Sequence, residues 1–187
     1  MDINIYKTPE ELADKLADHI INNHLNKNIA LSGGSTPLNL FKALSKKLDS
    51  IDNECKFYWV DERCVPPESD DSNYKMANSF LFCSNNIKKE NIFRIKGEND
   101  PEEEVINYSK TLRKNLKLVN NLPSFELVIL GLGDDGHTAS IFPHELEKFK
   151  ESTDCVLATH PTSGQNRISL SEKIINNSKE IIFHVSG

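Results

Sequence analysis

The chain has 187 residues, and its 22 basic and 28 acidic side chains give a formal net charge of −6. This length suits one α/β domain with a single hydrophobic core. An acidic chain without a basic block is a poor nucleic-acid binder, and no run approaches the roughly 18 apolar residues of a membrane span. The N-terminal segment MDINIYKTPEEL lacks the basic and apolar regions of a secretory signal, so we expect a cytoplasmic protein.

Short apolar runs alternate with helical patterns along the whole chain. The apolar runs predict strands at residues 3–6, 28–32, 56–60, 92–95, 125–133, 155–159, 167–170 and 180–186. Capping residues and helical spacing predict helices that begin near residues 9 and 37 and that cover 72–82, 101–118 and 171–177. This alternation predicts an α/β fold with a doubly wound, mostly parallel sheet flanked by helices. Because no linker or repeat divides the chain, we expect one domain over residues 1–187.

Three segments of unusual composition follow predicted strands: SGGSTP (32–37), VDERCVP (60–66) and GLGDDGHTASIFP (131–143). Together they contain five of the eight glycines, and their convergence at predicted strand ends is the strongest signal in the sequence pattern. Ligands of an open parallel sheet bind outside the carboxyl ends of its strands. We therefore expect these segments to meet at one binding site.

The first segment places two glycines, two hydroxyl groups and a proline between a strand and a helix. Free N–H groups at a helix N-terminus, together with the hydroxyls of Ser35 and Thr36, suit a phosphate group. The spacing and the lysine of a Walker A loop are absent. A plain tight turn in which Thr36 caps the helix explains the segment equally well.

The charged triplet Asp61-Glu62-Arg63 follows an aromatic strand and allows two interpretations. Arg63 can reach a phosphate or another substrate oxygen, which its planar guanidinium matches well. Alternatively, the triplet is a solvated loop with an internal ion pair, which is the usual fate of such charges.

The third segment holds Asp135-Gly136-His137, an imidazole with a carboxylate two positions away. Histidine can act as a general base near neutral pH without a large pKa shift. The alternative is a histidine satisfied by a local hydrogen bond. Metal binding by this segment is less favoured, since no HxxxH or HExxH pattern is present and His144 lies seven residues further on. No GxSxG sequence is present either, which favours histidine-activated water over an acyl-enzyme.

The four cysteines are scattered and form no CxxC pair: Cys55, Cys64, Cys83 and Cys155. No histidine lies near them at metal-ligand spacing. We expect reduced and mostly buried thiols.

Four segments resemble the 6-phosphogluconolactonase family: SGGSTP (32–37), VDERCVPPESDDSNY (60–74), GLGDDGHTASIFP (131–143) and HPTSGQNRISLS (160–171). They follow one another in the family's order along nearly the whole chain. The resemblance implies a Rossmann-like fold shared with glucosamine-6-phosphate deaminases. It also implies hydrolysis of 6-phospho-D-glucono-1,5-lactone to 6-phospho-D-gluconate in the oxidative pentose phosphate pathway, without a metal or an organic cofactor.

The resemblance assigns roles to particular residues. His137 matches the base that activates water, and Asp135 matches the carboxylate beside it. The positions implied for binding of the substrate or its phosphate are Gly33, Gly34, Ser35, Thr36, Asp61, Arg63 and Arg167. The implied partner is a phosphorylated sugar lactone, with neither nucleic acid nor membrane involved, and no oligomeric state is specified.

Two alternatives to lactone hydrolysis stay open. In the related deaminases a glutamate precedes the proline that ends the histidine segment, whereas this chain has Phe142 there. An apolar ring cannot relay a proton, so the lactonase is favoured. The second alternative is a non-catalytic sugar-phosphate-binding module. Its motive is that family members usually continue with a Gly-x-x-Lys-like segment and a terminal helix beyond the position where this chain reads Ser186-Gly187, so we expect that C-terminal segment to be lacking.

Overall fold

Five parallel strands form the centre of the computed structural model, which describes residues 2–48, 54–82, 87–151 and 154–186. The middle strand, β1 (Asn28–Leu31), pairs with β2 (Lys56–Trp59) on one side and β7 (Leu127–Leu130) on the other. β4 (Ile92–Phe93) extends the sheet beyond β2, and β10 (Ile181–Phe183) extends it beyond β7. The parallel sheet confirms the predicted α/β fold.

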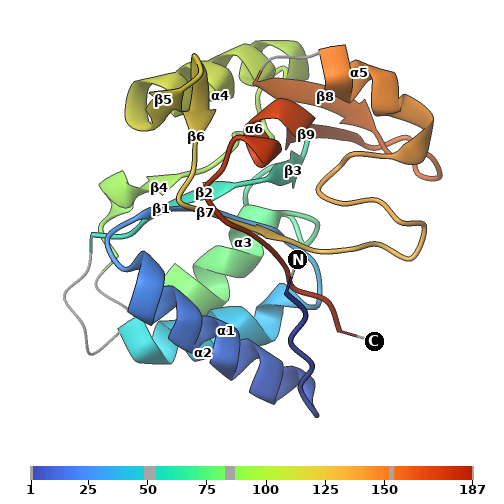
Figure 1. Cartoon of the computed structure of the whole chain (residues 1–187). Helices are drawn as coiled ribbons and strands as arrows, with labels where there is room; N and C mark the ends of the chain where they lie inside the picture. The colour runs from blue at the N-terminus through green and yellow to red at the C-terminus, as the bar shows by residue number, and fades with distance from the viewer. Residues whose placement is uncertain (1, 49–53, 83–86, 152–153, 187) are drawn as a thin grey trace.

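Helices cover both faces of this sheet (Figure 1). The elements on one face are α1 (Pro9–His24), α2 (Pro37–Leu48), α3 (Asn73–Ala77) and the π-helical turn Asn78–Phe82. The other face carries α4 (Pro101–Asn115), α5 (Leu146–Glu151) and α6 (Glu172–Asn176), with 3₁₀ turns at Lys89–Asn91 and Pro143–Glu145 elsewhere in the chain. The predicted doubly wound arrangement is therefore present.

A second, antiparallel sheet joins β3 (Asp61–Arg63), β9 (Asn166–Leu170) and β8 (Cys155–Thr159) in that order. Strands at the positions of β8 and β9 were predicted from the sequence, but their antiparallel pairing was not. The triplet 61–63 is a strand paired to β9, so the interpretation of a solvated loop was wrong. Backbone hydrogen bonds to a neighbouring strand, which a sequence pattern does not reveal, hold it extended.

Two element predictions were wrong. Residues 3–6 form no strand, and Ile3 and Ile5 are 72% and 89% exposed, because an apolar run too short to be buried on its own finds no partner strand in the described chain. The helix expected to reach residue 118 ends at Asn115, and β5 (Lys117–Val119) and β6 (Leu122–Ser124) then form a hairpin. Its two turn residues, Asn120 and Asn121, have positive φ angles of 51° and 61°, which such short hairpin turns require and asparagine tolerates.

The helix starts follow their capping residues. The Thr8 hydroxyl accepts a hydrogen bond from the N–H of Glu11 at 3.1 Å, as the predicted cap requires. At α4, the Asp100 carboxylate accepts the N–H groups of Glu102 and Glu103. Three glutamates in that first turn also suit the positive end of the helix dipole.

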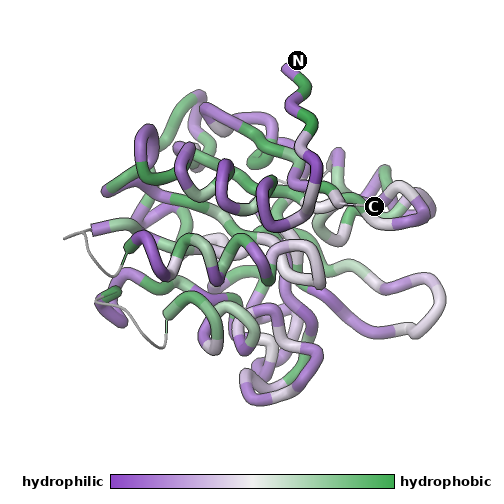
Figure 2. Tube along the Cα trace, turned by 90° about the horizontal axis from the view of Figure 1, so that it is seen from below, coloured by the Kyte–Doolittle hydropathy of each residue, from purple (hydrophilic) through white to green (hydrophobic). Residues whose placement is uncertain are grey.

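Packing of the helices on the sheet builds the main hydrophobic core. Apolar and hydrophilic residues alternate along the helices of the α1–α2 face (Figure 2). The buried residues of these helices include Leu16 and Ile20 of α1 and Leu40 and Leu44 of α2, as expected for one apolar stripe per helix. On the other face, the buried Tyr108 hydroxyl of α4 donates to the carbonyl of Trp59 at 3.0 Å and accepts its N–H at 2.9 Å. Cys55 and Cys155 are buried free thiols and Cys64 is half-buried, whereas Cys83 lies outside the described residues.

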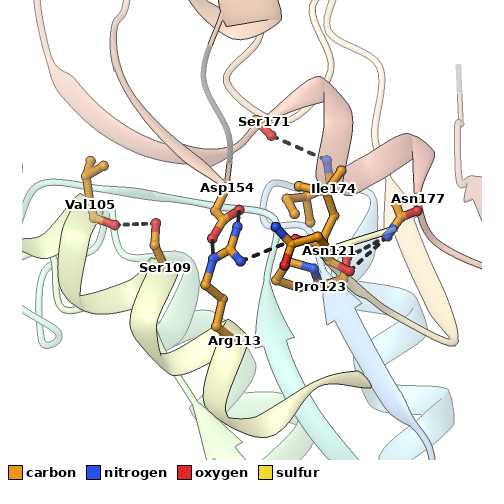
Figure 3. Close-up of polar contacts among 10 residues, drawn as sticks. Val105, Ser109, Arg113, Asn121, Pro123, Asp154, Ser171, Ile174 and Asn177 are labelled. Carbon is orange, nitrogen blue, oxygen red and sulfur yellow. Dashed lines mark hydrogen bonds and ion pairs between the residues drawn. The ribbon is translucent and has the colours of Figure 1, made fainter. Parts of the chain in front are cut away.

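Polar contacts fasten the second sheet and the hairpin to the helices around them (Figure 3). Arg113 on α4 forms a two-pronged ion pair with the buried Asp154 beside β8, and it also donates to the carbonyl of Asn121. The Asn177 amide donates to three carbonyls of the hairpin, including that of Pro123 at 3.2 Å. Within the described ranges, no helix is long and apolar enough to cross a membrane.

The strand order determines where the loops meet. The chain leaves β1 toward β2 on one side, and β7 later occupies the opposite side, so the strand order reverses at β1. Because all five strands run in the same direction, the segments after β1, β2 and β7 emerge at one carboxyl edge. Ligands of open α/β sheets bind at this reversal point.

Candidate active site

A cavity of about 190 Å³ opens at this carboxyl edge. It is lined by the loop after β1, the loop after β7, and residues of β3 and β9. The predicted site residues among its lining are Gly33, Gly34, Ser35, Thr36, Asp61, Arg63, His137 and Arg167. Asp135, the remaining predicted residue, contacts His137. The structure thus brings together all the positions expected from the sequence.

The glycine loop after β1 depends on close backbone packing. A Cβ atom at Gly33 would lie 1.8 Å from the Asn73 side chain, so no other residue fits there without displacing it. Gly34 has a φ of +100°, a conformation that glycine adopts without strain. Ser35 and Thr36 then lead directly into α2, and the Thr36 hydroxyl lies 3.2 Å from that of Ser186. The loop therefore presents the N-terminus of a 12-residue helix to the cavity.

Two arginines line the same cavity without a direct ion pair in the described part of the chain. Arg63 and Arg167 are directly opposite in the β3–β9 register. Neither forms an ion pair within the described residues, and the Nε atom of each is buried without a hydrogen-bond partner. Arg63 donates to the carbonyl of Asp71 at 2.6 Å, and Arg167 lies over the Phe142 ring at 5.6 Å. Burial and the nearby Arg63 lower the pKa of Arg167, although the carboxylates of Asp61, Asp71 and Glu62 act to raise it.

Asp61 and Glu62 have structural partners. The buried Asp61 carboxylate accepts the Ser140 hydroxyl at 2.7 Å, and Asn73 donates to the Asp61 carbonyl at 2.9 Å. The Glu62 carboxylate accepts the N–H groups of Asn73 and Tyr74, both at 2.8 Å, and so holds the start of α3. Burial raises the pKa of Glu62, although these hydrogen bonds act to lower it. Glu62 thus orders the segment that follows Arg63.

His137 and Asp135 form a pair within a tight turn. Gly136 between them has a φ of +84°, and the His137 N–H donates to the Asp135 carboxylate at 3.2 Å. The same carboxylate oxygen contacts His137 Nδ1. This contact lowers the pKa of Asp135 and favours the imidazole tautomer that carries its proton on Nδ1. His137 Nε2 is then left with a lone pair that can accept a proton.

Two further residues position the His137 ring, and sequence reasoning did not assign them this role. A Cβ atom at Gly133 would lie 2.3 Å from the ring, so the glycine provides the space that the imidazole occupies. The fully buried Phe142 packs against the same ring with centroids 4.9 Å apart. Asn73 and Ser140, which fix Asp61, were also missed. Their only signal was their place within the motif segments, since neither residue type marks a site by itself.

Comparison with known proteins identifies the family. Residues 6–187 match the family described as glucosamine-6-phosphate isomerases/6-phosphogluconolactonase, and the chain belongs to it. It is 42% identical to a 6-phosphogluconolactonase of Haemophilus influenzae over 97% of this chain and 79% of that protein. A 6-phosphogluconolactonase of Treponema pallidum is 43% identical, with 85% of this chain and 67% of that protein covered.

Solved structures agree with this family. The crystal structure of the devB protein superposes with a TM-score of 0.91 at 37% identity, over 97% of this chain and 79% of that one. The 6-phosphogluconolactonase of Trypanosoma brucei superposes with a TM-score of 0.86 at 28% identity, over 98% of this chain and 81% of that one. The fold predicted from the resemblance is therefore confirmed.

Proposed function

We infer that this chain is a 6-phosphogluconolactonase, which hydrolyses 6-phospho-D-glucono-1,5-lactone to 6-phospho-D-gluconate in the oxidative pentose phosphate pathway. The observation that carries this inference is the position of the His137–Asp135 pair at the same small cavity as a helix N-terminus and two arginines whose Nε atoms have no hydrogen-bond partner. The arginines and the helix N-terminus suit a phosphate, and the His137–Asp135 pair suits proton transfer. The names of the relatives support the same activity.

The phosphate group binds on the arginine side of the cavity. The N–H groups at the start of α2 and the hydroxyls of Ser35 and Thr36 supply hydrogen bonds to its oxygens. Arg63 and Arg167 supply positive charge, and their unpartnered Nε atoms gain acceptors when the phosphate enters. Binding at this remote group orients the lactone ring toward His137.

His137 acts as the base that activates water. Its Nε2 atom accepts a proton from a water molecule while the water oxygen attacks the lactone carbonyl carbon. Asp135 holds the imidazole through Nδ1 and stabilises the imidazolium that forms. The tetrahedral intermediate then collapses, the bond from the carbonyl carbon to the ring oxygen breaks, and His137 returns its proton to that oxygen. The product acid loses its own proton to solvent and leaves as a carboxylate.

The oxyanion of the intermediate requires donors of its own. The N–H groups of Gly133 and Gly136 already donate within the turn, to carbonyls at 2.8 and 2.9 Å, and the N–H of His137 donates to Asp135. Of the donors considered from the sequence, these contacts leave the N–H of Asp134 and the Arg63 side chain to stabilise the oxyanion.

The related deaminase reaction is not favoured by this site. Phe142 occupies the position at which the deaminases are expected to carry a glutamate, and its ring is fully buried between His137 and Arg167. An apolar ring provides no proton relay. Glucosamine 6-phosphate is therefore expected to release no ammonia.

A coupled assay tests the function. The lactone is generated in place from glucose 6-phosphate, and formation of 6-phosphogluconate is followed against the spontaneous rate. We expect a rate proportional to the amount of protein and well above that background. Folded protein that binds 6-phosphogluconate without accelerating hydrolysis would instead identify a non-catalytic sugar-phosphate-binding module, and ammonia release from glucosamine 6-phosphate would identify a deaminase. The cytoplasmic location and the lack of nucleic-acid partners stay predictions.

A further inference from the structure

Two histidines and a glutamate converge on the side of the molecule away from the candidate active site. His19 Nε2 lies 3.0 Å from one carboxylate oxygen of Glu180, and His24 Nε2 lies 2.6 Å from the other. One ligand atom from each residue lies within 4.8 Å of the other two. Among the described residues, this is the one group of three or more histidine, cysteine, aspartate or glutamate side chains whose ligand atoms lie close enough together to hold a metal ion.

The cluster lies at the opposite edge of the sheet from the cavity. His24 is the last residue of α1, and the chain then enters the amino end of β1. Glu180 directly precedes β10 and so also lies at the amino end of a strand. The cavity is at the carboxyl ends of the same parallel strands. The cluster therefore belongs to no part of the site described above.

We propose that His19, His24 and Glu180 bind one divalent transition-metal ion of the zinc class. Two imidazole nitrogens and one carboxylate form a donor set that zinc commonly takes, with water completing the tetrahedron. Zinc–nitrogen bonds of 2.0–2.1 Å place tetrahedral ligands about 3.3 Å apart, so each present contact opens by less than about 1 Å. Hard ions such as Mg²⁺ prefer oxygen ligands and suit this donor set poorly.

The surroundings favour entry and retention of the ion. The side chains of His19 and Glu180 are 37% and 38% exposed, which leaves a path from solvent. The His24 side chain is only 9% exposed. His19 Nδ1 lies 3.2 Å from the Asn23 amide nitrogen. A metal-bound imidazole carries its proton on the other nitrogen, so the Asn23 amide has to rotate to accept that proton, at the loss of the hydrogen bond that it donates to the His19 carbonyl at 3.0 Å.

Metal binding at this cluster would join two segments distant in sequence. Glu180 is 156 positions from His24, and the strand that it precedes, β10, pairs only with β7 among the strands of the described residues and so lies at the edge of this sheet. An ion held by α1 and Glu180 would fasten this edge strand to the helix beneath it (Figure 1). Because the ion binds the folded chain, its affinity adds to the stability of the fold.

A zinc titration of metal-stripped protein tests the proposal, with bound metal measured by equilibrium dialysis and the melting temperature measured with and without Zn²⁺. We expect one Zn²⁺ per chain and a melting temperature that rises with its concentration, with no comparable response to Mg²⁺. His19→Gln and Glu180→Gln should each weaken binding by at least about tenfold. His144→Gln removes an exposed histidine outside the cluster and should leave binding unchanged.

Several results would overturn the proposal. These are no zinc binding by the unmodified chain, equal binding in the two cluster variants, or loss of binding only in His137→Asn, which would place the ion in the cavity. Since His19→Gln and Glu180→Gln also remove hydrogen bonds, the deciding quantity is the zinc-dependent shift within each variant. His19 lies on a partly exposed helix face, so the His19→Gln variant is expected to fold.

Discussion

Arg63 and Arg167 lie directly opposite each other on β3 and β9, with no carboxylate ion-paired to either in the described part of the chain. A buried cation without an ion pair costs stability, so the buried Arg167 with the half-buried Arg63 opposite it points to an anionic ligand at this cavity wall. Substitution of one of these arginines should therefore affect ligand binding and the stability of the fold in different ways.

Replacing Arg167 by methionine should preserve the melting temperature and weaken substrate binding. Arg167→Met removes a buried cation while keeping an apolar chain over Phe142, so the melting temperature should not fall. Hydrogen bonds to charged groups are worth about 1.5–3 kcal/mol, so KM should rise about ten- to a hundredfold. Steady-state kinetics and thermal melts measure both. Arg94→Met, at an arginine paired to Glu98, is the matched control and should leave KM unchanged. An unaltered KM in Arg167→Met would contradict the assignment of the phosphate.

Removing the proton-transfer group should abolish most turnover and spare binding. His137→Asn should lower kcat by about 10²–10⁴-fold, the usual contribution of a general base. Asp135→Asn should lower kcat as well, because an amide can stabilise neither the required tautomer nor the imidazolium. Single-turnover kinetics and calorimetric binding of 6-phosphogluconate separate the two effects. Turnover near that of the unmodified chain in His137→Asn would exclude this residue as the base.

A single methyl group beneath the imidazole should disturb catalysis. In Gly133→Ala the new Cβ would lie 2.3 Å from the His137 ring, so the ring must shift from its present position. We expect a lower kcat, since misplacement by about 1 Å can cost a hundredfold. Gly131→Ala adds the same group to the same loop with no atom within 4 Å and should cost much less. Equal kcat values for the two variants would show that the ring does not depend on the space at Gly133.

A buried histidine should make stability depend on pH. The His184 side chain is 2% exposed and its Nδ1 atom has no partner, and burial lowers its pKa below the ordinary value of 6.5. Below pH 6.5 the unfolded chain therefore binds a proton that the folded chain does not, and stability falls until pH reaches the lowered pKa. The slope contributed is at most about 1.4 kcal/mol per pH unit.

Denaturant unfolding between pH 7.5 and pH 4.5 measures this slope. His184→Gln should flatten the dependence relative to the unmodified chain, whatever its effect on absolute stability. His160, whose pKa is also lowered by burial and by Arg167, contributes equally to both proteins and cancels from the comparison. Parallel curves for the two proteins would show that His184 does not titrate differently on unfolding.

Local sequence patterns were sufficient to predict most of the helices and strands and the segments that line the candidate active site. The Thr8 cap, the apolar runs at β1, β2 and β7, and the glycine segments after two of these strands depend on interactions within a few residues. These patterns predicted the parallel sheet and the edge at which the site lies. The motif segments also predicted which side chains would line it.

Tertiary structure decided what depends on residues distant in the chain. Asp61, Glu62 and Arg63 read as a polar loop, yet pairing with β9 makes them a strand and sets Arg63 opposite Arg167. Likewise, the histidines of α1 meet Glu180 only because β10 returns to the edge of the sheet. Sequence periodicity reflects the secondary structure that a segment prefers locally, whereas these contacts depend on pairing between strands far apart in the sequence. The sequence by itself therefore determined the elements and the reactive groups, and the folded chain determined their partners.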